Sequence, residues 1–154
     1  MENFKIDLFI KENKGKSFPE FEKLSENECL LLKQALFKKL QLNVFDNDVI
    51  ELLNLLRKTS IIVPNINADS ESFNLQEIIN TIITSEVNYV NVNWYQFNDI
   101  DRFKVKDLND YFKYIWYPGP DDIEIFPNDL SWMILIDATG SVFIYKFSQL
   151  VVVL

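Results

Sequence analysis

The spacing of hydrophobic residues divides the chain into a helical front part and a strand-rich back part. Over residues 32–40, apolar residues recur at helical spacing, and lysines lie away from that stripe. The preceding segment, Ser25-Glu26-Asn27-Glu28, matches a capping box. In that motif a serine hydroxyl and a glutamate three residues later satisfy each other's free backbone donors. The pattern therefore predicts a helix that begins near Ser25.

Two further helices and a strand are expected before residue 84. Asp46 or Asn47 can cap a helix that ends on Arg57 and Lys58, where positive charge suits the helix dipole. Its inward-facing residues are Val49, Ile50, Leu52, Leu53 and Leu56. Residues 60–64 favour a short strand that stops at Pro64. Residues 75–83 are predicted to be a helix, because their apolar pairs recur four residues apart.

The back part of the chain has the patterns of several strands and one helix. Residues 90–94 alternate between apolar and polar, as in a half-buried strand. Asp107 can cap a helix with a single apolar stripe over residues 108–116, ended by Pro118-Gly119-Pro120. Residues 123–125, 130–136 and 142–147 favour strands. Gly140 is expected to supply the positive φ of the hairpin between the last two, and 150–154 is expected to be a further strand.

These elements predict a single α+β domain over residues 1–154. Its N-terminal helices pack on one face of a mainly antiparallel C-terminal sheet.

Composition excludes several classes of function. The chain has 15 basic and 23 acidic residues, a net charge of −8, so a phosphate backbone would be repelled and we expect no nucleic-acid partner. It contains no histidine, which excludes Ser-His and Cys-His nucleophiles and His-ligated zinc. Cys29 lies among leucines and is interpreted as a small buried hydrophobe. The chain has 3 glycines and no phosphate-binding loop. We expect neither a cofactor nor a metal.

The sequence also bears on location and origin. Residues 1–7 lack the basic-then-apolar order of a secretory signal, and no apolar run approaches the roughly 20 residues of a membrane span. We therefore expect a cytoplasmic protein with no membrane partner. Asn, Lys, Ile, Phe and Tyr are frequent, which suggests an AT-rich bacterial genome.

Acidic and aromatic residues gather in the back part. All 6 tyrosines and all 3 tryptophans fall between Tyr89 and Tyr145. The densest segment, residues 116–126, combines two aromatic rings with three carboxylates around a rigid turn. Those residues are Trp116, Tyr117, Asp121, Asp122 and Glu124. Three readings stay open for it: a solvated turn, a site for protein binding, and a set of carboxylates for a divalent cation or for acid–base hydrolysis.

A second acidic pair, Asp99 and Asp101, precedes Arg102. As a surface loop with local ion pairs it would contribute little. In a binding surface the two aspartates would be rim charges. Among the tryptophans, Trp116 at a helix end is expected to be exposed, whereas alternation along residues 130–136 places Trp132 in the core.

Three back-part segments carry a resemblance to known proteins: Tyr114–Pro118, Asp121–Phe126 and Ser131–Asp137. They resemble small acidic bacterial proteins, some of which are immunity proteins of contact-dependent or polymorphic toxin systems. The resemblance spans residues 89–147. In such proteins a charged or His-containing turn often follows the aspartate, whereas this chain continues with Ala138-Thr139-Gly140.

The resemblance implies a non-catalytic binding protein that neutralises a basic toxin, and the charge pattern is compatible with that function. An acidic surface accelerates encounter with a basic partner, and desolvated aromatic anchors slow dissociation. The partner-binding residues would be Trp116, Tyr117, Asp121, Asp122 and Glu124, with Asp99 and Asp101 at the rim. Two alternatives remain. One is a carboxylate-based hydrolase or divalent-metal protein, and the other is a scaffold subunit of an assembly. The sequence leaves the oligomeric state open.

Overall fold

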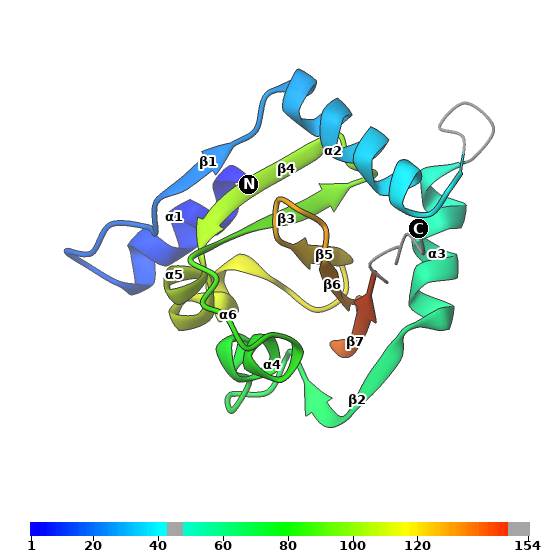
Figure 1. Ribbon diagram of the computed structural model, residues 1–154. Helices are drawn as coiled ribbons and strands as arrows, with labels where there is room; N and C mark the ends of the chain where they lie inside the picture. The colour runs from blue at the N-terminus through cyan, green and yellow to red at the C-terminus, as the bar shows by residue number, and fades with distance from the viewer. Residues whose placement is uncertain (43–47, 148–154) are drawn as a thin grey trace.

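The computed structural model describes residues 1–42 and 48–147, which form a seven-stranded sheet with helices on both sides (Figure 1). Every pair of neighbouring strands is antiparallel. In spatial order the strands are β1 (Phe21–Lys23), β4 (Asp99–Lys104), β3 (Tyr89–Tyr95), β5 (Ile123–Phe126), β6 (Trp132–Ile136), β7 (Ser141–Lys146) and β2 (Ile61–Asn67). The expected α+β class, with N-terminal helices and a mainly antiparallel sheet, is confirmed.

The helices form two layers, one on each face of the sheet (Figure 1). One layer holds α2 (Glu26–Lys39) and α3 (Val49–Thr59). The other holds α1 (Asn3–Glu12), α4 (Leu75–Ile82), α5 (Val105–Asp110) and α6 (Phe112–Ile115). The expectation that helices cover only one face is wrong. The reason is visible in β6, which is buried along its whole length: Trp132 and Ile134 face the α4–α6 core, while Met133 and Leu135 face the α2–α3 core. A strand that is apolar on both faces needs cover on both.

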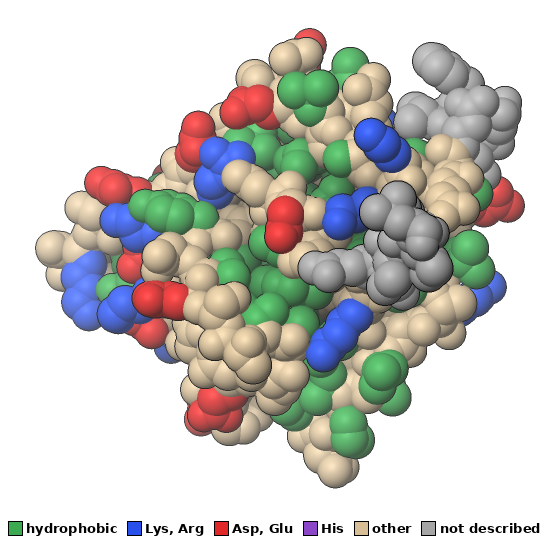
Figure 2. Space-filling model, viewed as in Figure 1, with side chains coloured by type: hydrophobic (Ala, Val, Ile, Leu, Met, Phe, Trp, Pro, Cys, Tyr) green, Lys and Arg blue, Asp and Glu red, His purple; other side chains and the backbone are tan. Residues whose placement is uncertain are grey.

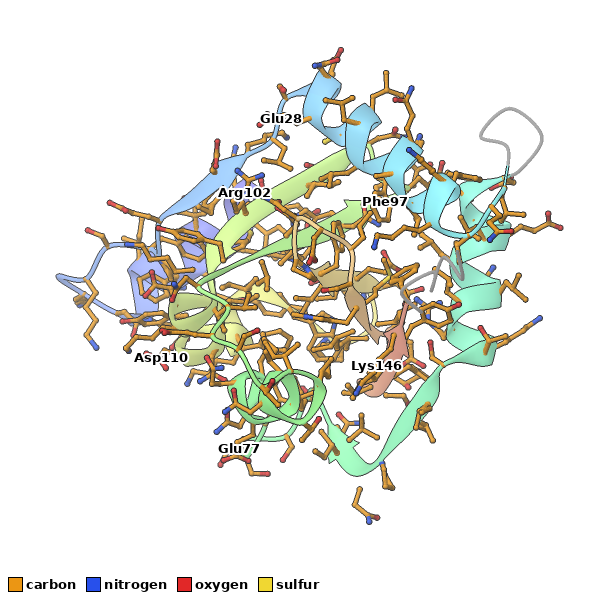
Figure 3. The ribbon with its side chains drawn as sticks, viewed as in Figure 1. Glu28, Glu77, Phe97, Arg102, Asp110 and Lys146 are labelled. Atoms are coloured by element: carbon orange, nitrogen blue, oxygen red, sulfur yellow. The ribbon has the colours of Figure 1, made fainter. Side chains whose placement is uncertain are left out.

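Local signals in the sequence locate most of these elements correctly. The capping box forms as predicted, since Ser25 Oγ accepts from the Glu28 N–H and the Glu28 carboxylate accepts from the Ser25 N–H at 2.8 Å (Figure 3). The helix over 75–83, the strand at 90–94 and the three later strands are also confirmed. Gly140 has a φ of +85° in the β6–β7 turn, as expected. Cys29 and Trp132 are buried, in agreement with their interpretation.

Four details differ from the sequence expectations. Strand β2 continues past Pro64 to Asn67, which is possible because β2 is an edge strand and needs no N–H donor on its open side. The helix expected from Asp107 is two short helices: α5 starts after Lys104, and the chain breaks at Tyr111. Ile50 is about half exposed rather than inward.

The fourth detail concerns the start of α3, where Asp48 is the cap and its carboxylate accepts from the Ile50 N–H at 2.7 Å. Asp46 and Asn47, the caps expected there, lie outside the described residues, as does the strand expected at 150–154.

The turn between β3 and β4 joins the sheet to the α2–α3 layer. Phe97 in this turn is fully buried and stacks on Phe126 of β5, with ring centroids 5.0 Å apart (Figure 3). The Asn93 side chain accepts from the Phe97 N–H at 2.8 Å, which holds the turn against the end of β3. In the part of the chain that the structure describes, no helix is both long and apolar enough to span a bilayer.

Candidate partner-binding site

A cavity of about 440 Å³ opens where β3 ends and β5 begins. Its walls come from the start of α1, from α3, from the β3–β4 turn and from the first residues of β5. Five carboxylate side chains line it, and among the lining side chains they face one arginine, Arg57. The five are Glu2, Asp99, Asp121, Asp122 and Glu124. We call this the acidic cavity. It collects four of the seven residues predicted to bind a partner.

On its α3 side, the acidic cavity contains two carboxylates that share one cation. The Arg57 Nη2 atom lies 3.1 Å from Asp122 Oδ1 and 3.4 Å from Glu124 Oε1. The second oxygen of Glu124 accepts from the Asn93 amide at 2.6 Å. Burial raises the pKa of Glu124 to about 7, although Asn93 and Arg57 favour its charged form. Burial also raises the pKa of Asp122, partly offset by Arg57.

Next to the α1 side of the cavity, the lining residue Asp121 is paired with a cation of the chain itself, Lys5. Lys5 is fully buried; its Nζ lies 2.5 Å from Asp121 Oδ2 and donates to the Ile115 carbonyl at 2.9 Å. The same Nζ lies 4.4 Å from the ring centroid of Trp94 and 5.5 Å from that of Tyr117. Aromatic faces and a carboxylate together are favourable surroundings for an ammonium group. The predicted residues Tyr117 and Asp121 therefore do bind a positive charge, but it belongs to α1.

The two predicted rim charges, Asp99 and Asp101, have different environments. Asp99 lines the cavity and is partly exposed; Lys23 Nζ lies 3.3 Å from its Oδ1, yet that buried oxygen has no hydrogen bond within the described residues. Asp101 is fully buried, against the expectation of a rim position. Its Oδ2 accepts from Trp94 Nε1 at 2.8 Å and from the amino group of Met1. Adjacent positions in β4 point to opposite faces, so Asp99 and Asp101 share a face but lie at different depths.

The prediction that Trp116 is an exposed anchor is wrong. Its side chain is 2% exposed, stacks on Phe112 and donates from Nε1 to the Asp121 carbonyl at 3.0 Å. The residue follows α6 directly and belongs to the core between that helix and the sheet. Tyr117 is half-buried, and Asp121 and Glu124 are buried as well, Glu124 within the central strand β5. Asp122 is exposed, as expected.

The exposed ring at the cavity comes from Tyr95 instead. Tyr95 is 63% exposed and, with the half-buried Trp94, lines the cavity at the end of β3. Acidic residues do not form a continuous surface on the face shown in Figure 2, where Lys and Arg side chains lie next to Asp and Glu. The predicted residues that the structure does bring together line a localised acidic cavity with two aromatic side chains, Trp94 and Tyr95, in its wall.

Sequence reasoning missed the two cations that organise the site, Lys5 and Arg57. Both lie far from their partners in the sequence, with separations of 116 between Lys5 and Asp121 and 67 between Arg57 and Glu124. No local pattern links such distant positions. Tyr95 had a weak signal, since it ends an alternating strand just before a turn.

The metal alternative requires several ligand side chains grouped around one point. In residues 1–42 and 48–147, no three Asp, Glu, Cys or His side chains are grouped so that they could share a metal ion. Asp122 and Glu124 are both paired with Arg57 instead.

Comparisons with known proteins found no matching family model, no matching curated protein and no matching solved structure.

Proposed function

We propose that this chain is a non-catalytic binding protein whose acidic cavity takes a basic side chain of a partner protein. Neutralisation of a basic toxin, as in immunity proteins, is the form of this function that the sequence resemblance favours. The observation that supports the proposal is the acidic cavity itself, in which five carboxylates face one lining arginine beside the rings of Trp94 and Tyr95.

Charge and geometry favour a cationic occupant. A volume of about 440 Å³ lies within the range of ligand-binding cavities and accommodates a lysine or arginine side chain with its flanking backbone. A guanidinium group stacks on aromatic rings and pairs with carboxylates, and the cavity offers both. The net charge of −8 would steer a basic partner toward the molecule over longer distances.

Binding of an oligoarginine peptide tests this proposal. An oligocitrulline peptide of equal length is the control, because citrulline keeps the shape of arginine without its charge. We expect the arginine peptide to bind more tightly, Asp99→Lys and Asp122→Lys to slow its association and flatten its salt dependence, and Tyr95→Ala to speed its dissociation. Stopped-flow fluorescence at several salt concentrations measures these rates.

The matched control variant is Glu71→Lys. Glu71 is exposed in the segment before α4, and its substitution changes the net charge as much as Asp99→Lys does. Equal losses in the two variants would mean that only the overall charge of the molecule matters. Equal binding of the arginine and citrulline peptides would contradict the proposal.

Carboxylate-based hydrolysis is a second candidate, and one observation favours it. A buried glutamate with a pKa of about 7 beside a second carboxylate is a suitable acid–base pair. A panel of nitrophenyl glycosides and nitrophenyl phosphates assayed between pH 5 and pH 8 tests it. This candidate requires a turnover that Glu124→Gln abolishes, and a panel without turnover would count against it.

A further inference from the structure

We propose that a basic side chain entering the acidic cavity displaces a proton from Glu124, so that binding strengthens as the pH rises through neutrality. This inference rests on the proposed function and adds the way in which the same site is regulated. It follows from the number of charges around Glu124 and from its position in the cavity wall.

The first step is a charge count. When both carboxylates are ionised, Asp122 and Glu124 carry two negative charges against the single positive charge of Arg57. Among the residues that the structure describes, the only other group that bonds to Glu124 is the amide of Asn93, which is neutral. Among the described residues, the charged or hydrogen-bonding groups that face the carboxyl belong to three residues: Arg57 in α3, Asn93 in β3 and Asp122 in the segment just before β5. The cluster therefore lacks one positive charge.

The second step concerns what supplies that charge. Glu124 is 3% exposed, so water cannot stabilise its ionised form. Burial raises the pKa of Glu124 to about 7, and the nearby charge of Asp122 acts in the same direction. Without a ligand, a proton on Glu124 therefore removes the excess negative charge. Asp122 is exposed and can remain ionised beside Arg57. Protonation of Glu124 thus neutralises the cluster when no ligand is present.

The third step is the exchange of that proton for a ligand. A guanidinium or ammonium group in the cavity provides the missing positive charge and favours the ionised form of Glu124, and the proton leaves to solvent. Linkage requires that a ligand whose binding releases a proton binds more tightly at higher pH. If the bound cation lowers the pKa of Glu124 by about two units, affinity rises roughly tenfold between pH 6 and pH 8.

Isothermal titration calorimetry with the oligoarginine peptide tests this inference. Arginine stays charged over this pH range, so a change in affinity reports on the protein. We expect proton release near pH 7, detected as a difference in heat between phosphate and Tris buffers, and the roughly tenfold rise in affinity. Glu124→Gln, which mimics the protonated form, should bind equally at all pH values and roughly tenfold more weakly than the wild type at pH 6.

A second variant tests the charge count directly. Asp122→Asn leaves Arg57 to Glu124 alone, which lowers the pKa of Glu124, so the pH dependence should move to more acidic values. Binding without proton release, or a pH dependence that survives in Glu124→Gln, would overturn the inference and leave the proposed function standing. Absence of charge-dependent peptide binding at every pH would overturn both.

Discussion

Lys5 and Glu124 are both buried, but their charges are compensated to different extents. Lys5 has a carboxylate and a carbonyl as hydrogen-bond partners and two aromatic rings above it, so it is well compensated. Glu124 shares the one cation that it meets among residues 1–42 and 48–147, Arg57, with Asp122 and is poorly compensated. The outcome depends on how many opposite charges reach the group, because burial removes the hydration of both.

The pair of Lys5 and Asp121 is expected to be important for stability. Lys5→Met leaves Asp121 buried without a cation and should lower the free energy of unfolding by about 3–5 kcal/mol. Adding Asp121→Asn to that variant should recover most of the loss, because no unpaired charge then remains. Urea unfolding followed by tryptophan fluorescence measures both effects. A double variant less stable than Lys5→Met would mean that the contacts of Asp121 with the backbone matter more than its charge.

Whereas the Lys5–Asp121 pair stabilises the folded state, ionised Glu124 is expected to destabilise it. Its pKa is raised from 4.5 to about 7 in the folded state, so the folded state binds a proton more tightly than the unfolded chain. The stability that this group contributes is complete below about pH 4.5 and is lost as the pH rises through 7, by about 3 kcal/mol in total. Glu124→Gln removes this loss.

The comparison of Glu124→Gln with the wild type isolates this residue from other titrating groups. Urea midpoints measured from pH 5 to pH 8 should diverge in favour of the variant up to about pH 7 and then differ by a nearly constant amount. A constant difference between the two proteins over that range would show that Glu124 titrates outside it.

At the scale of elements, short-range signals decide where helices begin and long-range contacts decide how they continue. The capping box at Ser25 predicts the start of α2 correctly, because all its donors and acceptors lie within four residues. The apolar stripe over 108–116 was misinterpreted as one helix. The chain breaks at Tyr111, whose φ of −117° is not helical and which separates α5 from α6, and the periodicity of apolar residues carries no information about such a break.

The capping box gives a prediction at this scale. Ser25→Ala removes the acceptor for the Glu28 N–H and should destabilise the protein by about 1 kcal/mol. The bond from the Ser25 hydroxyl also holds the pKa of Glu28 below its usual value, so that pKa should rise in the variant. Ser25→Thr is the control and should retain most of the stability. Urea unfolding and NMR titration of Glu28 are the measurements; equal stability of Ser25→Ala and wild type would contradict the prediction.

At the scale of the whole molecule, two cores share one sheet. All three tryptophans belong to or pack against the core under α4–α6, whereas Cys29 lies in the core under α2 and α3. Strand β6 contributes side chains to both cores. If either helix layer unfolded, the apolar face of the sheet beneath it would therefore be exposed to water. This arrangement predicts a single cooperative transition.

Cys29 and the tryptophans allow that cooperativity to be measured in the unmodified protein. Cys29 is 3% exposed and burial raises the pKa of its thiol, so it should react slowly with a disulfide reagent in the native state. Thiol labelling and tryptophan fluorescence should change at the same urea concentration. Labelling at a lower concentration would show that the α2–α3 layer separates before the rest unfolds.

The sequence by itself determined what depends on neighbouring residues: the class of most elements, the turn at Gly140, the burial of Cys29 and Trp132, and the presence of acidic and aromatic residues in the same part of the chain. Tertiary structure decided which of those acidic side chains are paired within the chain and which can bind a partner. Lys5 pairs with Asp121, and Arg57 pairs with Glu124, from helices that are far away in the sequence. Helices cover both faces of the sheet. Pairing between distant charges depends on how the layers pack, and the hydrophobic periodicity of one segment does not indicate which other segments pack against it.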